Sequence, residues 1–275
     1  MLSNLVKAGF SVAVIYAAIY PVLNPPAPLE LKDNTSVVEA KKVEVKKPKQ
    51  AEKPVIVNVD LPDFSKYRDV KEKKRAFFAF LRPFVEQINT EIEAQRLLVK
   101  NLDLQTSSQE HRDEFQRLLK AYKVEASQSI TVDNIGPLKQ ELLKRLDIIP
   151  VELVLMQAAN ESAWGTSRFA LQANNLFGQW CFRKGCGIVP KGRPEGETYE
   201  VRKFKSPKQS IRGYFFNINA GYAYEELRTL RATLRAMNEE IDPYVIAEGL
   251  IPYSTRREAY VDEIQNMIRI NKKYI

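Results

Sequence analysis

Residues 157–165 read Gln-Ala-Ala-Asn-Glu-Ser-Ala-Trp-Gly and close an apolar helical pattern. Glu161 follows Ala158 at helical spacing, so the two side chains share one face of that helix. A carboxyl group set among apolar residues and beside Trp164 resists ionisation, because burial disfavours the charged form. We therefore predict that Glu161 holds a proton near neutral pH and that Gly165 breaks the helix.

A second segment, residues 173–180, combines amides with aromatic rings and reads Ala-Asn-Asn-Leu-Phe-Gly-Gln-Trp. Aromatic rings stack on the apolar C–H faces of sugars, and amides bond hydroxyl and acetamido groups. The rings could also belong to the core, and we expect at least one of them to do so. A protonated carboxyl group supplies the proton that a leaving glycosidic oxygen needs, so the two segments together predict glycoside cleavage. The candidate substrate-binding residues are Trp164, Asn174, Asn175, Phe177, Gln179 and Trp180.

Apolar residues at helical spacing predict helices on both sides of these segments. We expect a helical extension over residues 63–133, with one helix from about Tyr67 interrupted at Pro83, a second to about Val99 and a third near 115–122. The main domain, 134–275, is expected to hold helices near 135–146, 151–161, 207–218, 224–237 and 257–270. Glycines and prolines between 180 and 204, and alternation over 198–204, predict a small β-lobe. The predicted fold class is therefore α+β and mostly helical.

The N-terminal region indicates export. Residues 1–23 begin with a positive charge and continue as an apolar run, which is typical of a signal peptide or a membrane anchor, and we favour an inner-membrane anchor. Residues 24–62 are rich in proline and lysine and are expected to form a flexible linker. The net charge of +8 does not predict nucleic-acid binding, because the basic run carries no interleaved aromatic residues.

The chain has two cysteines, Cys181 and Cys186, and one histidine, His111. Two thiols and a distant histidine cannot complete a structural zinc site. In an exported protein, a pair that closes a short loop is most simply a disulfide, with two free thiols as the alternative.

The motifs Glu161-Ser-Ala-Trp-Gly-Thr-Ser and Ala173-Asn-Asn-Leu-Phe-Gly resemble the signature of the peptidoglycan N-acetylglucosaminidase domain, glycoside hydrolase family 73, and most closely its Bax-type branch. The resemblance covers residues 134–274, about half the chain. It implies a lysozyme-like domain that hydrolyses the β-1,4 bond after N-acetylglucosamine in periplasmic peptidoglycan, with no metal or organic cofactor. In that family's scheme Glu161 is the general acid.

The resemblance also implies a second acid in the β-lobe and a tyrosine that orients the substrate's acetamido group. Glu195, Glu197 and Glu200 compete for the first role, and we favour Glu200 because strand alternation includes it. Tyr253 occupies the tyrosine position, although Arg256 and Arg257 replace the family's Asp-Pro there. Two other functions remain open: a lytic transglycosylase, and a non-catalytic scaffold that binds glycan in the cell envelope.

Overall fold

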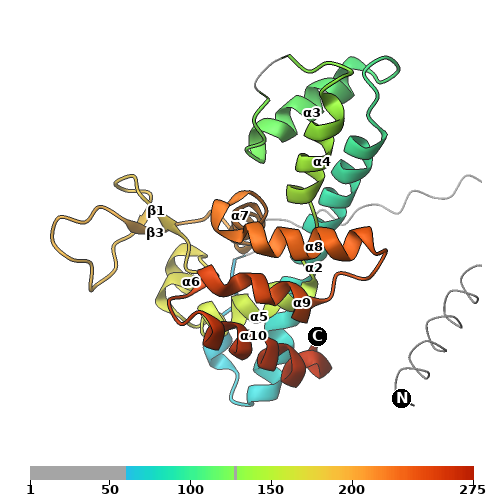
Figure 1. Cartoon of the computed structure of the whole chain (residues 1–275). Helices are drawn as coiled ribbons and strands as arrows, with labels where there is room; N and C mark the ends of the chain where they lie inside the picture. Colours follow the sequence, from blue (N-terminus) through green and yellow to red (C-terminus); the bar gives the residue numbers. More distant parts are fainter. Residues whose placement is uncertain (1–59, 127–128) are drawn as a thin grey trace, which may run out of the picture. The chain divides into compact units, whose positions relative to one another are not determined.

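Helices dominate the part of the chain that the structure, a computed structural model, describes: residues 60–126 and 129–275 (Figure 1). The longer helices are α2 (Val70–Asn101), α3 (Gln109–Ala121), α4 (Ile135–Arg145), α5 (Val151–Glu161), α7 (Pro207–Ala220), α8 (Glu225–Ala236) and α10 (Glu258–Asn271). The short ones are α6 (Arg168–Ala173) and α9 (Pro243–Ala247), and 3-10 turns span Phe64–Lys66, Tyr222–Tyr224, Glu248–Tyr253 and Lys272–Tyr274. The predicted mostly helical α+β class is confirmed.

The N-terminal predictions fall outside this description. The expected anchor, 1–23, and all but the last three residues of the expected linker, 24–62, lie outside the described residues. Among the helices that are described, none combines the length and the apolar character that crossing a membrane requires.

Helix α5 lies at the centre of the main domain and packs against α2 and α10. Every residue from Leu153 to Ala159 on it is buried, which explains why its sequence is apolar on nearly all sides. Pro150 is the N-cap residue of α5, directly before its first helical residue, Val151. Ser206 caps α7, because its hydroxyl oxygen accepts a hydrogen bond from the N–H of Gln209.

The predicted interruption at Pro83 is wrong, because α2 continues through it as one helix of 32 residues. A proline lacks the N–H that a helix interior uses, so its position costs one hydrogen bond. Buried residues on both sides of Pro83, among them Leu81, Phe84 and Val85, hold the helix against the core. Tertiary packing therefore outweighs the local preference.

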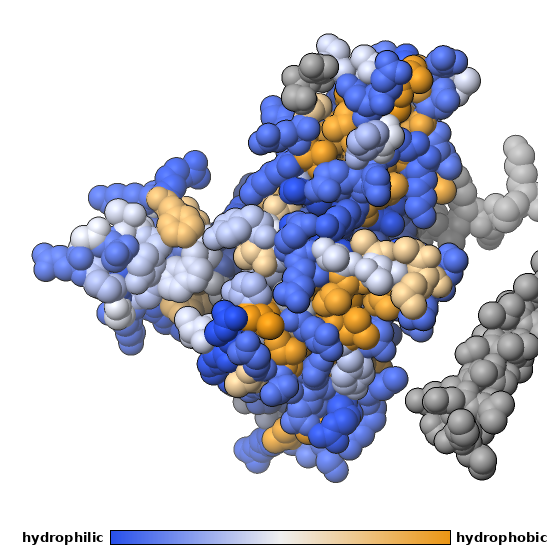
Figure 2. All heavy atoms as spheres, viewed as in Figure 1, coloured by the Kyte–Doolittle hydropathy of each residue, from blue (hydrophilic) through white to orange (hydrophobic). Residues whose placement is uncertain are grey.

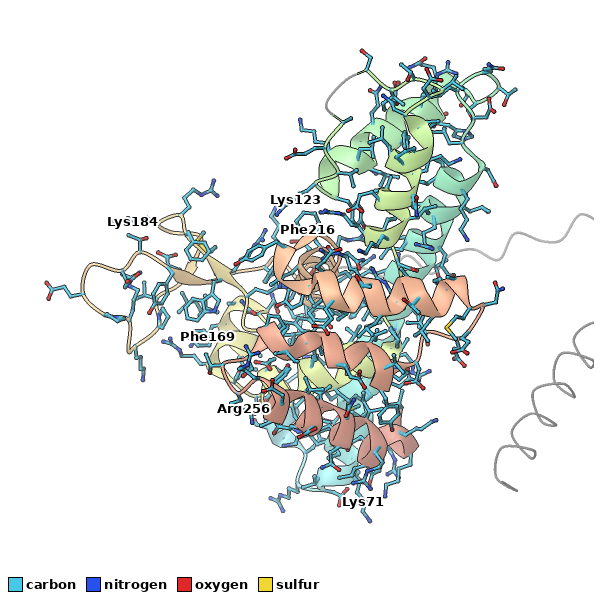
Figure 3. All side chains as sticks on the ribbon, viewed as in Figure 1. Lys71, Lys123, Phe169, Lys184, Phe216 and Arg256 are labelled. Carbon is cyan, nitrogen blue, oxygen red and sulfur yellow. A yellow bond between two sulfur atoms is a disulfide. The ribbon has the colours of Figure 1, made fainter. Side chains whose placement is uncertain are left out.

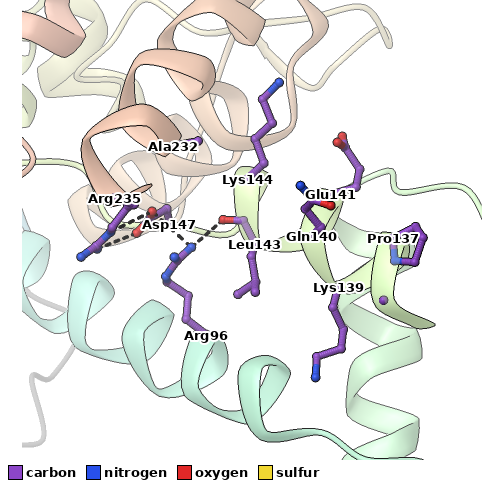
Figure 4. A pocket seen from close by; sticks show the side chains of 11 residues that line it. Arg96, Pro137, Lys139, Gln140, Glu141, Leu143, Lys144, Asp147, Ala232 and Arg235 are labelled. Carbon is purple, nitrogen blue, oxygen red and sulfur yellow. Dashed lines mark hydrogen bonds and ion pairs between the residues drawn. The ribbon is translucent and has the colours of Figure 1, made fainter. Parts of the chain in front are cut away.

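Three arginines gather at the C-terminal end of α4, and Figure 4 shows two of them, Arg96 and Arg235, around Asp147. Arg96 of α2 donates to the carbonyl oxygens of Leu143 and Leu146, at 2.6 and 2.5 Å. Arg231 and Arg235 of α8 join it around the single buried carboxylate of Asp147. Arg96 and Arg231 donate to carbonyls that the helix end leaves free, so this cluster ties α2, α4 and α8 together. A pocket of about 710 Å³ beside it holds none of the predicted site residues.

The β-lobe is a three-stranded antiparallel sheet of β1 (Trp180–Cys181), β2 (Gly187–Ile188) and β3 (Glu200–Arg202), in the order β1-β3-β2. It projects from the helical body and its visible face is mostly hydrophilic (Figure 2). Cys181 and Cys186 form the predicted disulfide across its first turn. Gly187 must be glycine, since a Cβ there would lie 1.9 Å from the carbonyl oxygen of Val201.

Candidate active site

Glu161 is the last residue of α5 and is half-buried. Its Oε1 accepts a hydrogen bond of 2.9 Å from the hydroxyl of Tyr260, on α10, and a longer one from Asn160. Burial raises the pKa of Glu161 above its ordinary value, and the hydrogen bond from Tyr260 opposes part of that rise. The predicted direction of the Glu161 pKa therefore agrees with the environment of the carboxyl group.

A directional chain of hydrogen bonds ends on this carboxylate. The buried hydroxyl of Tyr214 donates to Oε1 of Gln157, and Nε2 of Gln157 donates to the hydroxyl of Tyr260 at 3.0 Å. Tyr260 then donates to Oε1 of Glu161. Because Oε1 is occupied as an acceptor, a proton carried by Glu161 belongs on its other oxygen, Oε2.

The backbone leaves α5 through a turn that differs from the predicted one. The helix ends at Glu161, and Ala163, Trp164 and Gly165 all have positive φ angles, so the break begins before Gly165. Ser162 fixes this turn, because its hydroxyl donates to the carbonyl of Ala158 at 2.6 Å and accepts from the N–H of Gly165 at 2.8 Å.

The loop that follows α6 faces Oε2 of Glu161. Gly178 is exposed, and a Cβ added to it would lie 3.9 Å from Oε2. Asn175 is buried and shapes this loop, since its Nδ2 donates to the carbonyls of Gln179 and Arg202 and its Oδ1 accepts from the N–H of Gln179. The missing side chain at Gly178 therefore leaves room for a ligand atom beside the carboxyl oxygen that is free to carry a proton.

A groove of about 390 Å³ starts at this loop and runs between the β-lobe and α7. Its lining includes four of the residues predicted from sequence, Phe177, Gln179, Trp180 and Tyr253. Both polar atoms of the Gln179 side chain are shielded from solvent and find no hydrogen-bond partner among the described residues. An unpaired buried amide is costly, so Gln179 is placed to receive a polar ligand group.

Tyr253 joins the groove to the carboxyl site. Its hydroxyl donates to the carbonyl of Phe177 at 3.0 Å, and its ring stacks on Tyr260 with centroids 5.4 Å apart. Burial raises its pKa well above the ordinary value, so Tyr253 presents a neutral hydroxyl. Phe177 in turn stacks on Tyr214, with centroids 4.3 Å apart.

Other predicted residues lie elsewhere. The ring of Trp164 packs against Phe77 and Phe78 of α2, with centroids 5.7 and 5.3 Å apart, and it does not line the groove. Asn174 ends α6 in the left-handed region and donates to the carbonyl of Phe204. The structure therefore brings Trp164 and Asn174 to the ends of helices rather than to the groove.

Glu200 lies on β3 as predicted, but its carboxylate faces the disulfide turn. The side chain is buried, and its two oxygens accept the N–H groups of Gly185 and Gly187 at 2.9 and 2.8 Å. These bonds lower the pKa of Glu200 below its ordinary value. Glu195 and Glu197 are exposed on the loop before β3. The structure thus brings Glu161, Tyr253 and the groove together, but it does not bring Glu200 to them.

The same turn contains the one group of potential metal ligands found within residues 60–126 and 129–275, namely Cys181, Cys186 and Glu200. The two sulfurs are joined to each other in the disulfide and are therefore not thiolate ligands.

Sequence reasoning missed Tyr260, Tyr214 and the role of Gln157. Gln157 lies four residues before Glu161, so helical spacing could have indicated that the two side chains share a face. Nothing local pointed to Tyr260, which is 99 residues away from Glu161 in the chain. Arg256 and Glu263 form an ion pair near the site, and both affect the electrostatics of Glu161.

A half-buried carboxyl group whose pKa is raised by burial, beside an aromatic and amide-lined groove, is typical of a glycosidase site. Comparison with known families agrees: the glucosaminidase model, described as mannosyl-glycoprotein endo-beta-N-acetylglucosaminidase, matches residues 136–273. The chain belongs to this family, as the resemblance of its motifs predicted, and it is therefore a glycoside hydrolase by family. Among curated proteins it is similar to Protein bax of Escherichia coli (strain K12), with 34% identity over 218 residues that cover 78% of this chain and 76% of that protein. No solved structure matches the chain significantly.

Proposed function

We propose that this protein hydrolyses the β-1,4 glycosidic bond after N-acetylglucosamine in peptidoglycan, with Glu161 as the general acid. The observation that carries the proposal is the placement of Oε2 of Glu161. Tyr260 occupies Oε1, burial favours the protonated form, and Gly178 leaves the space beside Oε2 open. A glycosidic oxygen seated there would accept the proton as the bond breaks.

The groove residues supply the rest of the site in this proposal. Trp180 is half exposed and offers a ring face to a sugar, while the unpaired amide of Gln179 suits an acetamido or hydroxyl group. Tyr253 lies between Glu161 and the groove, where its neutral hydroxyl would orient the 2-acetamido group of the sugar at the scissile bond.

The second catalytic role goes to the substrate in our proposal. The oxygens of Glu200 are held by backbone N–H groups, which favours a structural role for this side chain in the β-lobe. The acetamido carbonyl of the substrate would then act as the internal nucleophile, a route used by some glycosidases that lack a second carboxylate at the reacting carbon. Glu195 and Glu197, on the exposed loop, are the alternatives for water activation.

A lytic transglycosylase is the second candidate, because one carboxylate, Glu161, adjoins the groove and one acid is sufficient for that reaction.

We also propose that the protein works in the periplasm, attached to the inner membrane through residues 1–23. Fractionation of cells that express the full chain tests this location, and recovery in the cytosol would contradict it.

The test of the reaction is a digest of purified peptidoglycan with the full chain and with Glu161→Gln, followed by borohydride reduction and mass spectrometry. Hydrolysis yields new reducing N-acetylglucosamine ends with the wild type and about 10²–10⁴ times fewer with the variant, the range of general acid catalysis. Anhydro-muramic ends would identify a transglycosylase. Equal cleavage by both proteins would remove Glu161 from its role, and glycan binding without cleavage would indicate a scaffold.

A further inference from the structure

The helical extension contributes a side chain to the groove. Lys123 follows α3, outside the region 136–273 that the family model matches, and yet it lines the groove together with residues of the β-lobe and α7. Lys123 lies beside Phe216 (Figure 3), with its ammonium group 5.9 Å from the ring centroid. The ring of the preceding Tyr122 lies 6.3 Å from the same ring. The groove is therefore shaped by the extension as well as by the family domain.

The backbone at Lys123 is one that normally selects glycine. Lys123 has a φ of 57° and occupies the position after the helix cap, where the N–H of Val124 bonds to the carbonyl of Leu119 at 2.9 Å. This is the Schellman arrangement, in which the left-handed residue is usually glycine because a Cβ is unfavourable there. A lysine at this position therefore costs folding stability, and strained positions of this kind cluster at binding sites.

The charged residues that line the groove are all basic. Lys123 stands on one side and Arg202, from β3, contributes a second cation, with its guanidinium group 5.0 Å from the ring centroid of Phe204. Neither cation has a carboxylate partner within 4 Å in the described part of the chain, and no lining residue there carries a carboxylate. A ligand that fills this groove therefore meets aromatic rings, an unpaired amide and two free cations.

We infer that the groove binds a glycan that carries carboxylates, and that Lys123 is a specificity residue which pairs with them. The inference rests on the proposed function for the identity of the glycan, peptidoglycan. In that polymer the carboxylates come from two sources, the peptide stems and the lactyl groups that are exposed where stems have been removed. A neutral glycan of N-acetylglucosamine would use the rings and the amide but leave both cations unpaired.

The experiment measures binding by the full chain carrying Glu161→Gln, so that cleavage does not deplete the ligand. Three ligands separate the sources: peptidoglycan with intact stems, peptidoglycan glycan from which an amidase has removed the stems, and neutral N-acetylglucosamine oligomers. Lys123→Gly is the informative variant, because glycine suits the left-handed backbone and the fold should keep or gain thermal stability. Lys120→Ala is the matched control, since it removes the same charge from an exposed position of α3 outside the groove.

We expect Lys123→Gly to weaken binding to at least one of the two anionic ligands about twofold to fivefold, the range of an exposed ion pair. The loss should disappear at high salt, should be absent for the neutral oligomers and should not occur with Lys120→Ala. Unchanged binding to both anionic ligands would overturn the inference, and so would an equal loss for the neutral oligomers. Cleavage by the wild type is scored separately, so a protein that shows this binding pattern without cutting contradicts the proposed reaction and not the role of Lys123.

Discussion

Removing the hydroxyl of Tyr260 should change both the stability of the fold and the pH dependence of cleavage. Tyr260→Phe keeps the ring that stacks on Tyr253, but it deletes two hydrogen bonds, the one donated to Glu161 and the one accepted from Gln157. The buried amide N–H of Gln157 would then lack its partner, and leaving such a group unsatisfied costs about 1–3 kcal/mol. We expect the variant to lose about 2 kcal/mol, which lowers the melting temperature by roughly 4–8 °C in a unit of this size.

The same change should move the pH dependence of cleavage. Burial raises the pKa of Glu161, and the hydrogen bond from Tyr260 opposes this rise because it stabilises the charged carboxylate. Without that bond the pKa rises further. A general acid works while it is protonated, so the high-pH limb of kcat should move to higher pH.

The assay is a pH profile of kcat on purified peptidoglycan, paired with thermal unfolding. Tyr214→Phe is the matched control, because it deletes a hydrogen bond to Gln157 without touching Glu161. This control should lose stability and keep its pH profile. A limb that moves to lower pH in Tyr260→Phe, or an equal movement in both variants, would refute the reasoning.

Three further changes test the structure. Folding raises the pKa of Glu161, so the wild type loses stability as the pH rises from the unfolded-state pKa through the folded-state pKa. The melting temperature of Glu161→Gln should therefore increase relative to that of the wild type as the pH rises. An increase confined to acid pH would contradict this. Glu200→Gln should lower the melting temperature, because an amide offers one acceptor oxygen where the N–H groups of Gly185 and Gly187 use two. Lost activity with unchanged melting would instead indicate a catalytic acid. Gly165→Ala would place a Cβ on a backbone with a φ of +77° and 2.6 Å from Cδ2 of Phe64. The free energy of unfolding, measured in urea, should fall by roughly 2–5 kcal/mol. An unchanged urea midpoint would contradict the clash.

The parts of the site that sequence could predict are those set by local spacing. Glu161 at the end of an apolar helix and the groove residues Phe177, Gln179 and Trp180 follow from neighbours within a few positions. Tyr260 could not be found in this way, because its contact with Glu161 depends on how α10 packs against α5. Alternation placed Glu200 on a strand, but it does not indicate which groups the carboxylate of Glu200 contacts in the folded protein.

The fold, like the site, could be predicted where it depends on local sequence and not where it depends on tertiary packing. Helical periodicity located the longer helices, since the apolar face of each is encoded within its own length, but it did not indicate the short helices α6 and α9. The break at Pro83 was wrong because the packing of α2 against the core is not visible in the local sequence. The turn after Glu161 also began earlier than Gly165 suggested, because the hydroxyl of Ser162 fixes it.

The contact between α2 and the turn after Glu161 has a consequence for how this family's domain is delimited. Trp164 rests on Phe77 and Phe78, and Gly165 lies against Phe64, so residues before the matched region 136–273 complete the core around α5. The border drawn by family comparison therefore passes through one packed core. A fragment that begins at residue 134 would expose these apolar faces to water. In related chains, we expect the aromatic residues of α2 and the residues that follow Glu161 to vary together, because they pack against each other.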